Sequence, residues 1–178
     1  MEREELAGVL AALTVEVRTG RGGGSGILSA QHGVVITCSH VLDGDAAEVV
    51  LHGGRETSAR VAARNNHADL ALLAIAPAAG PPLELRREPL RVGELLFAMG
   101  NPFGERGVLT SGVVLALPGD GLVHADLRVA PGNSGGPMVD ARGRLVGVVS
   151  MYRGGAAGAV PVSRIETLAA GLRRDSAA

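Results

Sequence analysis

Short stretches in which hydrophobic and polar residues alternate fill most of the chain. Alternation with a period of two is typical of half-buried strands, and many short strands at regular spacing predict an all-β barrel or sandwich. Apolar residues at helical spacing predict a short helix over the first dozen residues and another over residues 163–174. The pattern therefore indicates a β-rich fold with a helix at each end.

The expected strands form two sets of six, separated by the proline-rich stretch 77–89, which we expect to be a linker. The glycine cluster 20–26 predicts a turn. We expect strands within residues 14–20, 27–42 (a hairpin of two), 47–54, 55–65, 69–76, 94–100, 107–117, 121–129, 136–140, 144–152 and 157–162.

Composition agrees with a folded globular chain and excludes several chemistries. Of the 178 residues, 46% are hydrophobic and 20% are charged, which is ordinary for a globular protein. All 17 basic residues are arginine, so no Ser-Lys dyad, Schiff-base lysine or P-loop lysine is available. A net charge of −1 without a basic run argues against a nucleic-acid partner.

The cysteine count and the first residues bear on the compartment of the protein. Cys38 is the single cysteine and forms no internal disulfide, so nothing favours an oxidising compartment. The start carries three glutamates rather than the basic region of a signal peptide, and no apolar run approaches the roughly 18 residues of a membrane span. We therefore expect a soluble chain without a membrane span, which is cytoplasmic unless its N-terminus has been trimmed. Separately, we expect neither a metal nor a cofactor.

The strongest chemical signal is Ser134 within the glycine-rich sequence GNSGG, residues 132–136. This sequence matches the nucleophile elbow of α/β-hydrolases, which requires the acid and the histidine to follow the serine. The elbow is excluded because every histidine precedes Ser134. The order acid, histidine, serine would need an α/β fold, which the strand pattern opposes. The order histidine, aspartate, serine remains. The histidines are His32, His40, His52, His67 and His124.

Among these histidines, His40 ends an apolar β run, a position suited to a base at the edge of a cleft. Asp69 begins the aliphatic run DLALLAIA and is the first candidate for the acid that orients the base, with Asp126 as its main rival. The residues alone leave a triad plausible but not unique.

Five segments follow one another along the chain: GSGILSAQHGVVITCSHVL, DLALLAI, MGNPFG, LTSGVV and APGNSGGPMVDARGRLVGVVS. Together they resemble the trypsin-like protease domain of the HtrA/Deg serine proteases, over roughly residues 13–172. This resemblance implies a chymotrypsin fold: two six-stranded antiparallel β-barrels with the active site between them. It makes Ser134 the nucleophile, His40 the general acid and base, and Asp69 the residue that orients His40.

By the same resemblance, residues 1–178 form one protease domain. Residues 1–76 would hold the first helix and barrel, 77–89 the linker, 90–162 the second barrel and 163–178 the last helix and a tail. The implied oxyanion hole is the segment Gly132, Asn133 and Ser134, with the amides of Gly132 and Ser134 as donors.

The resemblance also implies where a polypeptide substrate binds. Ser150, Met151 and Tyr152 would pair with it as an added strand, with Ser150 hydrogen-bonded to Asp69. The S1 pocket would be lined by Val129, Ala130, Met151 and Tyr152, which favours small or medium apolar P1 residues unless Arg128 faces the pocket.

The expected function is therefore that of a serine endopeptidase acting through an acyl-enzyme. The alternative is a catalytically silent or gated protease fold that binds peptides or a partner protein. No PDZ domain is expected after residue 178, so the possible partners are copies of the same chain or a separate regulatory chain.

Overall fold

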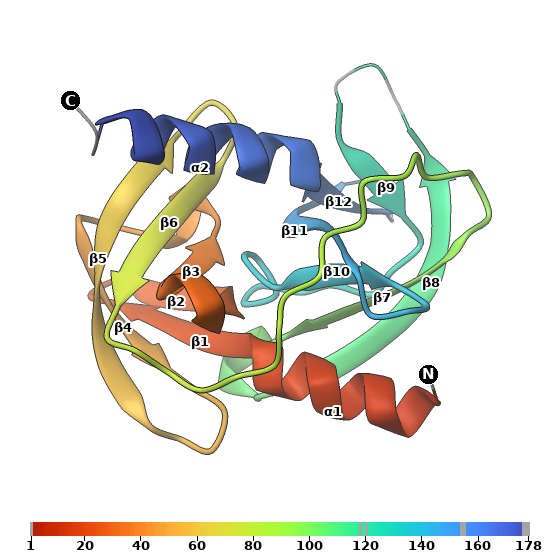
Figure 1. The fold of residues 1–178 in the computed structure, drawn as a ribbon. Coiled ribbons are helices and arrows are strands. Elements are labelled where there is room, and N and C mark those ends of the chain that lie inside the picture. The colour runs from red at the N-terminus through yellow and green to blue at the C-terminus, as the bar shows by residue number, and fades with distance from the viewer. Residues whose placement is uncertain (1, 118, 120, 154–155, 176–178) are drawn as a thin grey trace.

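The computed structural model describes the backbone of residues 2–117, 119, 121–153 and 156–175, and the side chains of the same residues apart from 151–153 and 172–175. Its strands form two closed antiparallel barrels of six strands each, side by side (Figure 1). The predicted fold class is confirmed.

The first barrel has the strand order β1-β2-β3-β6-β5-β4 and the second has the order β10-β11-β12-β9-β8-β7. In the first barrel the strands are β1 (Thr14–Thr19), β2 (Gly22–Ser29), β3 (Val34–Thr37), β4 (Ala46–Val50), β5 (Glu56–Asn65) and β6 (Leu70–Ile75). In the second they are β7 (Leu95–Gly100), β8 (Val108–Ala116), β9 (Val123–Ala125), β10 (Pro137–Asp140), β11 (Leu145–Arg153) and β12 (Ala156–Pro161).

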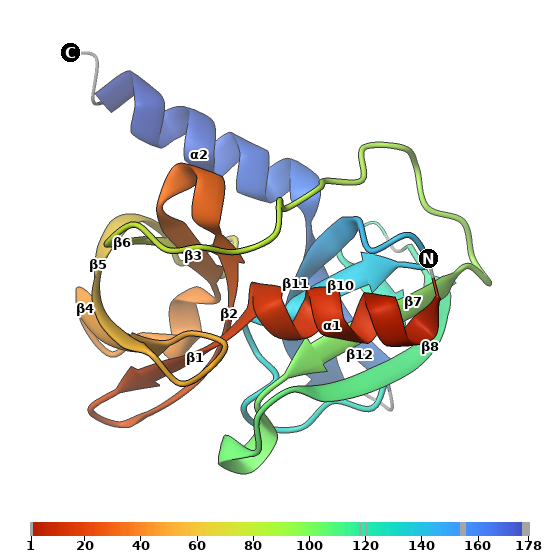
Figure 2. The same cartoon turned by 60° about the horizontal axis from the view of Figure 1, so that its bottom comes forward.

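A helix precedes the first strand and another follows the last. Helix α1 (Arg3–Leu13) buries Leu6, Leu10 and Leu13, and helix α2 (Val162–Asp175) packs against strands of both barrels. Figure 1 shows α2 above the barrels and α1 below them, and Figure 2 shows the same separation from another side. In the part of the chain described here, no helix is long and apolar enough to cross a membrane.

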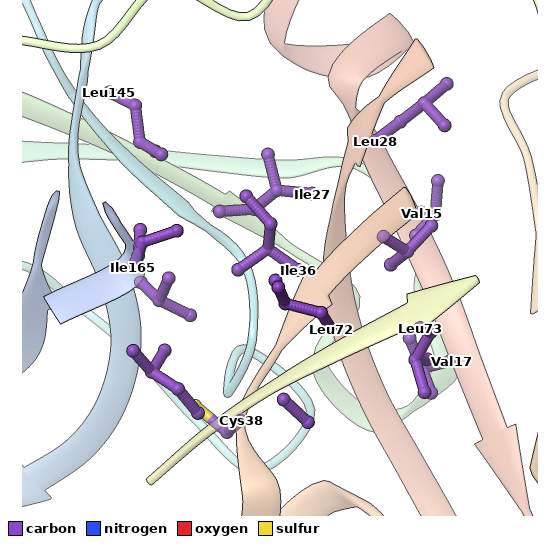
Figure 3. Close-up of a cluster of buried hydrophobic side chains, with 14 of the residues drawn as sticks. Val15, Val17, Ile27, Leu28, Ile36, Cys38, Leu72, Leu73, Leu145 and Ile165 are labelled. Carbon is purple, nitrogen blue, oxygen red and sulfur yellow. The ribbon is translucent and has the colours of Figure 1, made fainter. Parts of the chain in front are cut away.

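One hydrophobic cluster runs through the interface between the barrels. Figure 3 shows Ile27, Ile36 and Leu72 of the first barrel near Leu145 of the second and Ile165 of α2. All five side chains are buried. Burying apolar surface is the main favourable term in folding, so this cluster fixes the two barrels and α2 against one another.

The connection between the barrels, residues 76–94, is tied to the second barrel by backbone and side-chain contacts. Arg86 N–H donates to Leu145 O (2.9 Å), and Leu145 N–H donates to Glu84 O (2.7 Å). The Arg86 guanidinium forms ion pairs with Glu94 (2.5 Å) and Asp140 (3.6 Å). The proline-rich segment is therefore ordered along the barrel surface.

The glycine cluster 20–26 differs from the sequence-based prediction of a turn. Only residues 20 and 21 form the turn, and β2 begins at Gly22 and pairs with β1 from that residue onward. Contacts with distant parts of the chain hold these residues in a strand: they pair with β1, and Ser25 N–H donates to Ser134 O (2.8 Å). The strand thereby supports the segment that carries Ser134.

Candidate active site

His40 and Asp69 lie together on the first barrel. His40 is in a single 3₁₀ turn (Ser39–Val41) directly after β3, and Asp69 immediately precedes β6. The His40 Nδ1 atom is 2.8 Å from Asp69 Oδ2 and 3.0 Å from Oδ1. Because a carboxylate accepts hydrogen bonds, Nδ1 carries the proton and Nε2 keeps a free lone pair. The imidazole is thus held in the tautomer that a general base requires.

The turns that carry His40 and Asp69 are joined by a polar network. Ser39 Oγ donates to Asn66 Oδ1 (2.5 Å), and the Arg64 guanidinium donates to the carbonyls of Ser39 (2.9 Å) and Leu42 (3.1 Å). The His40 backbone N–H also donates to Asp69 Oδ1 (3.0 Å). These bonds fix the position of the two side chains relative to each other.

Asp69 adopts a left-handed backbone conformation, with a φ of 53°. Non-glycine residues rarely occupy this region, although aspartate tolerates it better than most, and such strain clusters at functional sites. Asp69 N–H donates to Asn66 O (3.4 Å), which closes the turn before β6. The strained turn brings the carboxylate back toward His40.

The pKa values of the pair shift in opposite directions. The hydrogen bond to Asp69 raises the pKa of His40 above its usual value, and partial burial opposes this only in part. Burial raises the pKa of Asp69, but hydrogen bonds from the His40 ring, the Ser150 hydroxyl and the His40 backbone outweigh it and hold the pKa below its usual value. Asp69 therefore remains ionised while it orients His40.

Ser134 belongs to the second barrel and lies in the loop between β9 and β10. Its hydroxyl donates to Ser150 O (3.3 Å), and no hydrogen bond between Ser134 and His40 is found among the described side chains. Both residues line the same cavity of about 730 Å³. In resting enzymes the bond between nucleophile and base is often long or poorly aligned, so this geometry does not exclude the pair.

The turn before Ser134 leaves the Gly132 amide without a protein acceptor among the described hydrogen bonds. Asn133 N–H donates to Ala130 O (2.9 Å), and Gly132 has a φ of 104°, which is the pattern of a type II turn. Pro131 O accepts from Phe103 N–H (3.1 Å). Because C=O and N–H point in opposite directions across a trans peptide, the Gly132 N–H is directed away from Phe103.

Asn133 is the one residue of the expected oxyanion segment whose own N–H is already taken. Its side chain also serves the turn, because Asn133 Oδ1 accepts from Ala130 N–H (3.0 Å). The amides of Gly132 and Ser134 therefore remain as the two donors on this segment without a described partner.

Gly135, directly after the serine, allows a close approach between the barrels. Its φ is 90°, and an added Cβ would lie 1.9 Å from Ser25 O. Any side chain here would push the serine loop away from the first barrel, so only glycine fits.

Strand β11 presents an unpaired backbone edge next to the serine loop. Strand β10 pairs with β11 only as far as Val148, whereas β12 follows β11 to Arg153. A bulge between Val149 and Met151 turns Ser150 out of the ladder, and Ser150 Oγ donates to Asp69 Oδ2 (2.5 Å), the contact expected from the sequence. Within the described backbone, the β10-facing edge of residues 151–153 has no partner strand.

Three of the five expected substrate-contact residues, Val129, Ala130 and Ser150, line the cavity together with His40 and Ser134. The side chains of the other two, Met151 and Tyr152, lie outside the described residues. Arg128 is exposed and does not line the cavity. The described lining of this cavity includes apolar side chains and no charge from Arg128, but it also includes Arg21 and Asp43.

The buried Cys38 lies close to His40 and Asp69, so the three residues could together offer ligand atoms to a metal ion. One donor atom of each residue lies within 4.8 Å of the others, the spacing of a potential metal cluster. Burial raises the pKa of the Cys38 thiol well above its usual value, and its S–H donates to Val149 O (3.2 Å). The thiol therefore stays protonated and acts as a buried packing group.

Two residues that sequence reasoning missed, Ser25 and Asn101, support the serine loop from behind. Asn101 follows β7, and both residues are buried. Each lies within a segment that resembles the HtrA/Deg domain, but nothing in their spacing indicates their contacts.

Comparison with known proteins agrees with this geometry. Residues 24–148 match the family model of the trypsin-like peptidase domain. A probable periplasmic serine endoprotease, DegP-like, from Brucella suis is 39% identical over 141 residues, and one from Halomonas elongata is 34% identical over 167 residues. These alignments cover 70% and 85% of this chain.

The crystal structure of the serine endoprotease from Yersinia pestis superimposes with a TM-score of 0.89 at 25% identity. The match covers 99% of this chain and 68% of that one. The chain spans 26% of the Brucella relative and 35% of the Halomonas relative.

The expected cytoplasmic location is wrong, because these relatives are named periplasmic proteases. A secretory leader is removed from a mature protein and takes no part in its folded domain. The first residues of a folded domain therefore do not identify its compartment, and a single cysteine does not exclude an oxidising one.

The resemblance inferred from the sequence, and the serine-protease class it implied, are confirmed by these matches. The family model covers well over half of the chain, and the two-barrel fold agrees with the Yersinia structure. The chain belongs to the family of trypsin-like peptidase domains and is similar to the DegP-like serine proteases within it.

Proposed function

We propose that this chain is a serine endopeptidase domain that hydrolyses peptide bonds through an acyl-enzyme. The observation that carries the proposal is the hydrogen-bonded pair His40–Asp69 facing a cavity that Ser134 and Gly132 also line. The pair comes from the first barrel and the serine from the second. We therefore also propose that both barrels act as one functional domain.

In the proposed mechanism His40 Nε2 takes the proton of the Ser134 hydroxyl as Ser134 Oγ attacks the substrate carbonyl. Asp69 stays ionised, accepts the hydrogen bond from the His40 Nδ1–H and stabilises the imidazolium that forms. The amides of Gly132 and Ser134 bind the oxyanion, and His40 then protonates the leaving amine. Water then attacks the acyl carbonyl as His40 Nε2 takes its proton, and the bond to Ser134 Oγ breaks as His40 returns that proton to Ser134, which releases the acid product.

We expect the substrate to bind as an added strand on the unpaired edge of β11. The apolar wall formed by Val129, Ala130 and Pro131 favours small or medium apolar side chains at P1. Arg128 is exposed and does not line the cavity, so it supplies no charge for an acidic P1 residue; Arg21 and Asp43, which do line the cavity, carry opposite charges.

The alternative is a gated or silent module that binds peptides without hydrolysing them. The observation that favours it is the Ser134 hydroxyl, which donates to Ser150 O rather than to His40. A rotation of the Ser134 side chain would be needed before proton transfer. The two proposals differ in whether Ser134 reacts in the resting protein.

A fluorophosphonate probe is expected to label the wild-type chain at Ser134, because the probe reacts with a serine activated by a base and an oxyanion hole. Labelling is measured by intact mass and the modified residue by peptide mapping. Ser134→Ala and heat-denatured wild type serve as controls and should remain unlabelled. Folded wild type that stays unlabelled from about pH 6 to 9, across the usual range of a histidine base, would favour the silent module.

The value of kcat/KM is expected to rise with pH, with a midpoint above 6.5. His40 accepts the serine proton only when its ring is neutral, and its pKa is raised from the usual value of about 6.5 by the hydrogen bond to Asp69. Activity is therefore lost as pH falls through this raised pKa. Peptide hydrolysis across pH gives the profile, and NMR titration of His40 in Ser134→Ala should give the same midpoint. A midpoint at or below 6.5 would contradict the assignment.

A further inference from the structure

Ser25 is a fully buried serine of the first barrel whose hydroxyl reaches the turn before Ser134. Its Oγ donates to Gly132 O (2.7 Å). The same oxygen accepts from the Asn101 backbone N–H (2.9 Å) and from the Asn101 side-chain amide (3.3 Å). A hydroxyl offers one donor and two acceptor positions, so Ser25 uses its full hydrogen-bonding capacity.

The backbone of Ser25 contacts the other side of the serine. Ser25 N–H donates to Ser134 O (2.8 Å), and Ser25 O lies where a Cβ on Gly135 would be. One residue thus contacts the chain both before and after Ser134. Ser25 belongs to β2, whereas its partners belong to the second barrel, so these contacts also set the distance between the barrels at the cavity.

The two peptide planes that flank Gly132 are fixed by different partners. Phe103 N–H holds the carbonyl of Pro131 (3.1 Å), and the Ser25 hydroxyl holds the carbonyl of Gly132. Glycine at positive φ has little intrinsic preference for one orientation, so these bonds supply the restraint that a side chain at this position cannot. Without the Ser25 hydroxyl, the part-buried Gly132 carbonyl and the buried Asn101 N–H would both lose their hydrogen-bond partner, which favours a rearranged turn.

We propose that Ser25 is a positioning residue: it holds the peptide that follows Gly132 and thereby keeps the turn in the conformation in which the Gly132 N–H, on the preceding peptide, faces the cavity. This inference rests on the proposed function, in which that N–H binds the oxyanion. Ser25 touches neither substrate nor reacting atoms and acts through Gly132. Ser25 should therefore affect the step in which negative charge develops on the substrate oxygen, which is seen in kcat. It should affect substrate binding, seen in KM, only a little.

The test compares Ser25→Ala with Ser29→Ala. Both serines are buried on β2, and the Ser29 hydroxyl bonds to His32 (2.8 Å) rather than to the second barrel. Losing one oxyanion donor typically costs about 10²–10³ in kcat, so a displaced donor in Ser25→Ala should lower kcat by about 10²-fold with little change in KM. Ser29→Ala should keep the wild-type kcat. Unfolding curves establish that each variant is folded at the assay temperature.

Two further readouts separate positioning from a general loss of structure. A peptide boronate places an oxygen in the oxyanion hole, so its affinity should fall in parallel with kcat/KM in Ser25→Ala. The midpoint of the pH profile of kcat/KM should stay unchanged, because the substitution does not touch the His40–Asp69 pair. The Gly132 amide resonance should shift in Ser25→Ala and not in Ser29→Ala.

An unchanged kcat in Ser25→Ala, an equal loss in Ser29→Ala, or a loss confined to KM would overturn the role of Ser25. A folded wild type that neither hydrolyses peptides nor reacts with a fluorophosphonate would instead contradict the proposed function. In that case the Gly132 amide resonance still tests whether Ser25 holds the turn. If this resonance has the same position in Ser25→Ala as in the wild type, the role of Ser25 is overturned.

Discussion

Replacing His40 by alanine is expected to lower kcat for peptide hydrolysis by about 10⁶-fold, because serine, histidine and aspartate act as a unit in such sites. In this structure, no other described histidine lines the cavity with Ser134. The substitution removes the hydrogen bond to Asp69 but leaves the barrels intact, since the His40 side chain is about half exposed.

Progress curves with a chromogenic peptide measure this loss, and His52→Ala, an exposed histidine between β4 and β5, is the matched control. Added imidazole is expected to restore part of the activity of His40→Ala, because it can occupy the space left in the cavity and accept the serine proton. A His40→Ala variant that retains more than a tenth of the wild-type kcat would contradict the role of His40.

Asp69→Asn is expected to lower kcat by about 10⁴-fold near neutral pH while changing KM little. The carboxylate accepts three hydrogen bonds, from the His40 ring, the His40 backbone and the Ser150 hydroxyl. An amide NH₂ in the same place donates instead, so the ring adopts the tautomer whose Nε2 carries a proton. That tautomer cannot take the proton of Ser134.

Asp126→Asn is the matched control, since Asp126 was the rival acid in the sequence and lies exposed on the second barrel. Its kcat should equal that of the wild type. The NMR titration midpoint of His40 should also fall in Asp69→Asn, because the hydrogen bond that raises the pKa of His40 is lost. Retained activity in Asp69→Asn together with a loss in Asp126→Asn would reverse the assignment.

Most of the fold could be predicted because short alternating runs report directly on strand burial. The run DLALLAIA became β6, whose first four residues are buried, and the two sets of six runs became the two barrels. The glycine cluster was misjudged for a physical reason. Local propensity favours a turn at such residues, but pairing with β1 and the contact between Ser25 and Ser134 hold them in a strand.

The residues of the candidate site differ in how strongly the sequence alone indicated their roles. The order of the histidines relative to Ser134 excluded one enzyme class outright, whereas the residues alone ranked Asp69 ahead of Asp126 without excluding Asp126, and the family resemblance decided between them. Ser25 and Asn101 gave no signal, because their bonds link segments 76 and 107 residues apart in the chain. These contacts form only when the two barrels pack together, and the pattern of hydrophobic and polar residues along the chain does not predict how two barrels pack.

The hydrophobic cluster shared by the barrels has a consequence for the newly made chain. The first barrel leaves the ribosome before Leu145 and Ile165, which complete that cluster, have been synthesised. At that stage His40 and Asp69 exist without Ser134, and the apolar surface around Ile27 is still open. In the proposed function, hydrolysis needs Ser134 together with His40 and Asp69, so the growing chain has no complete active site until the second barrel has been made and packed against the first.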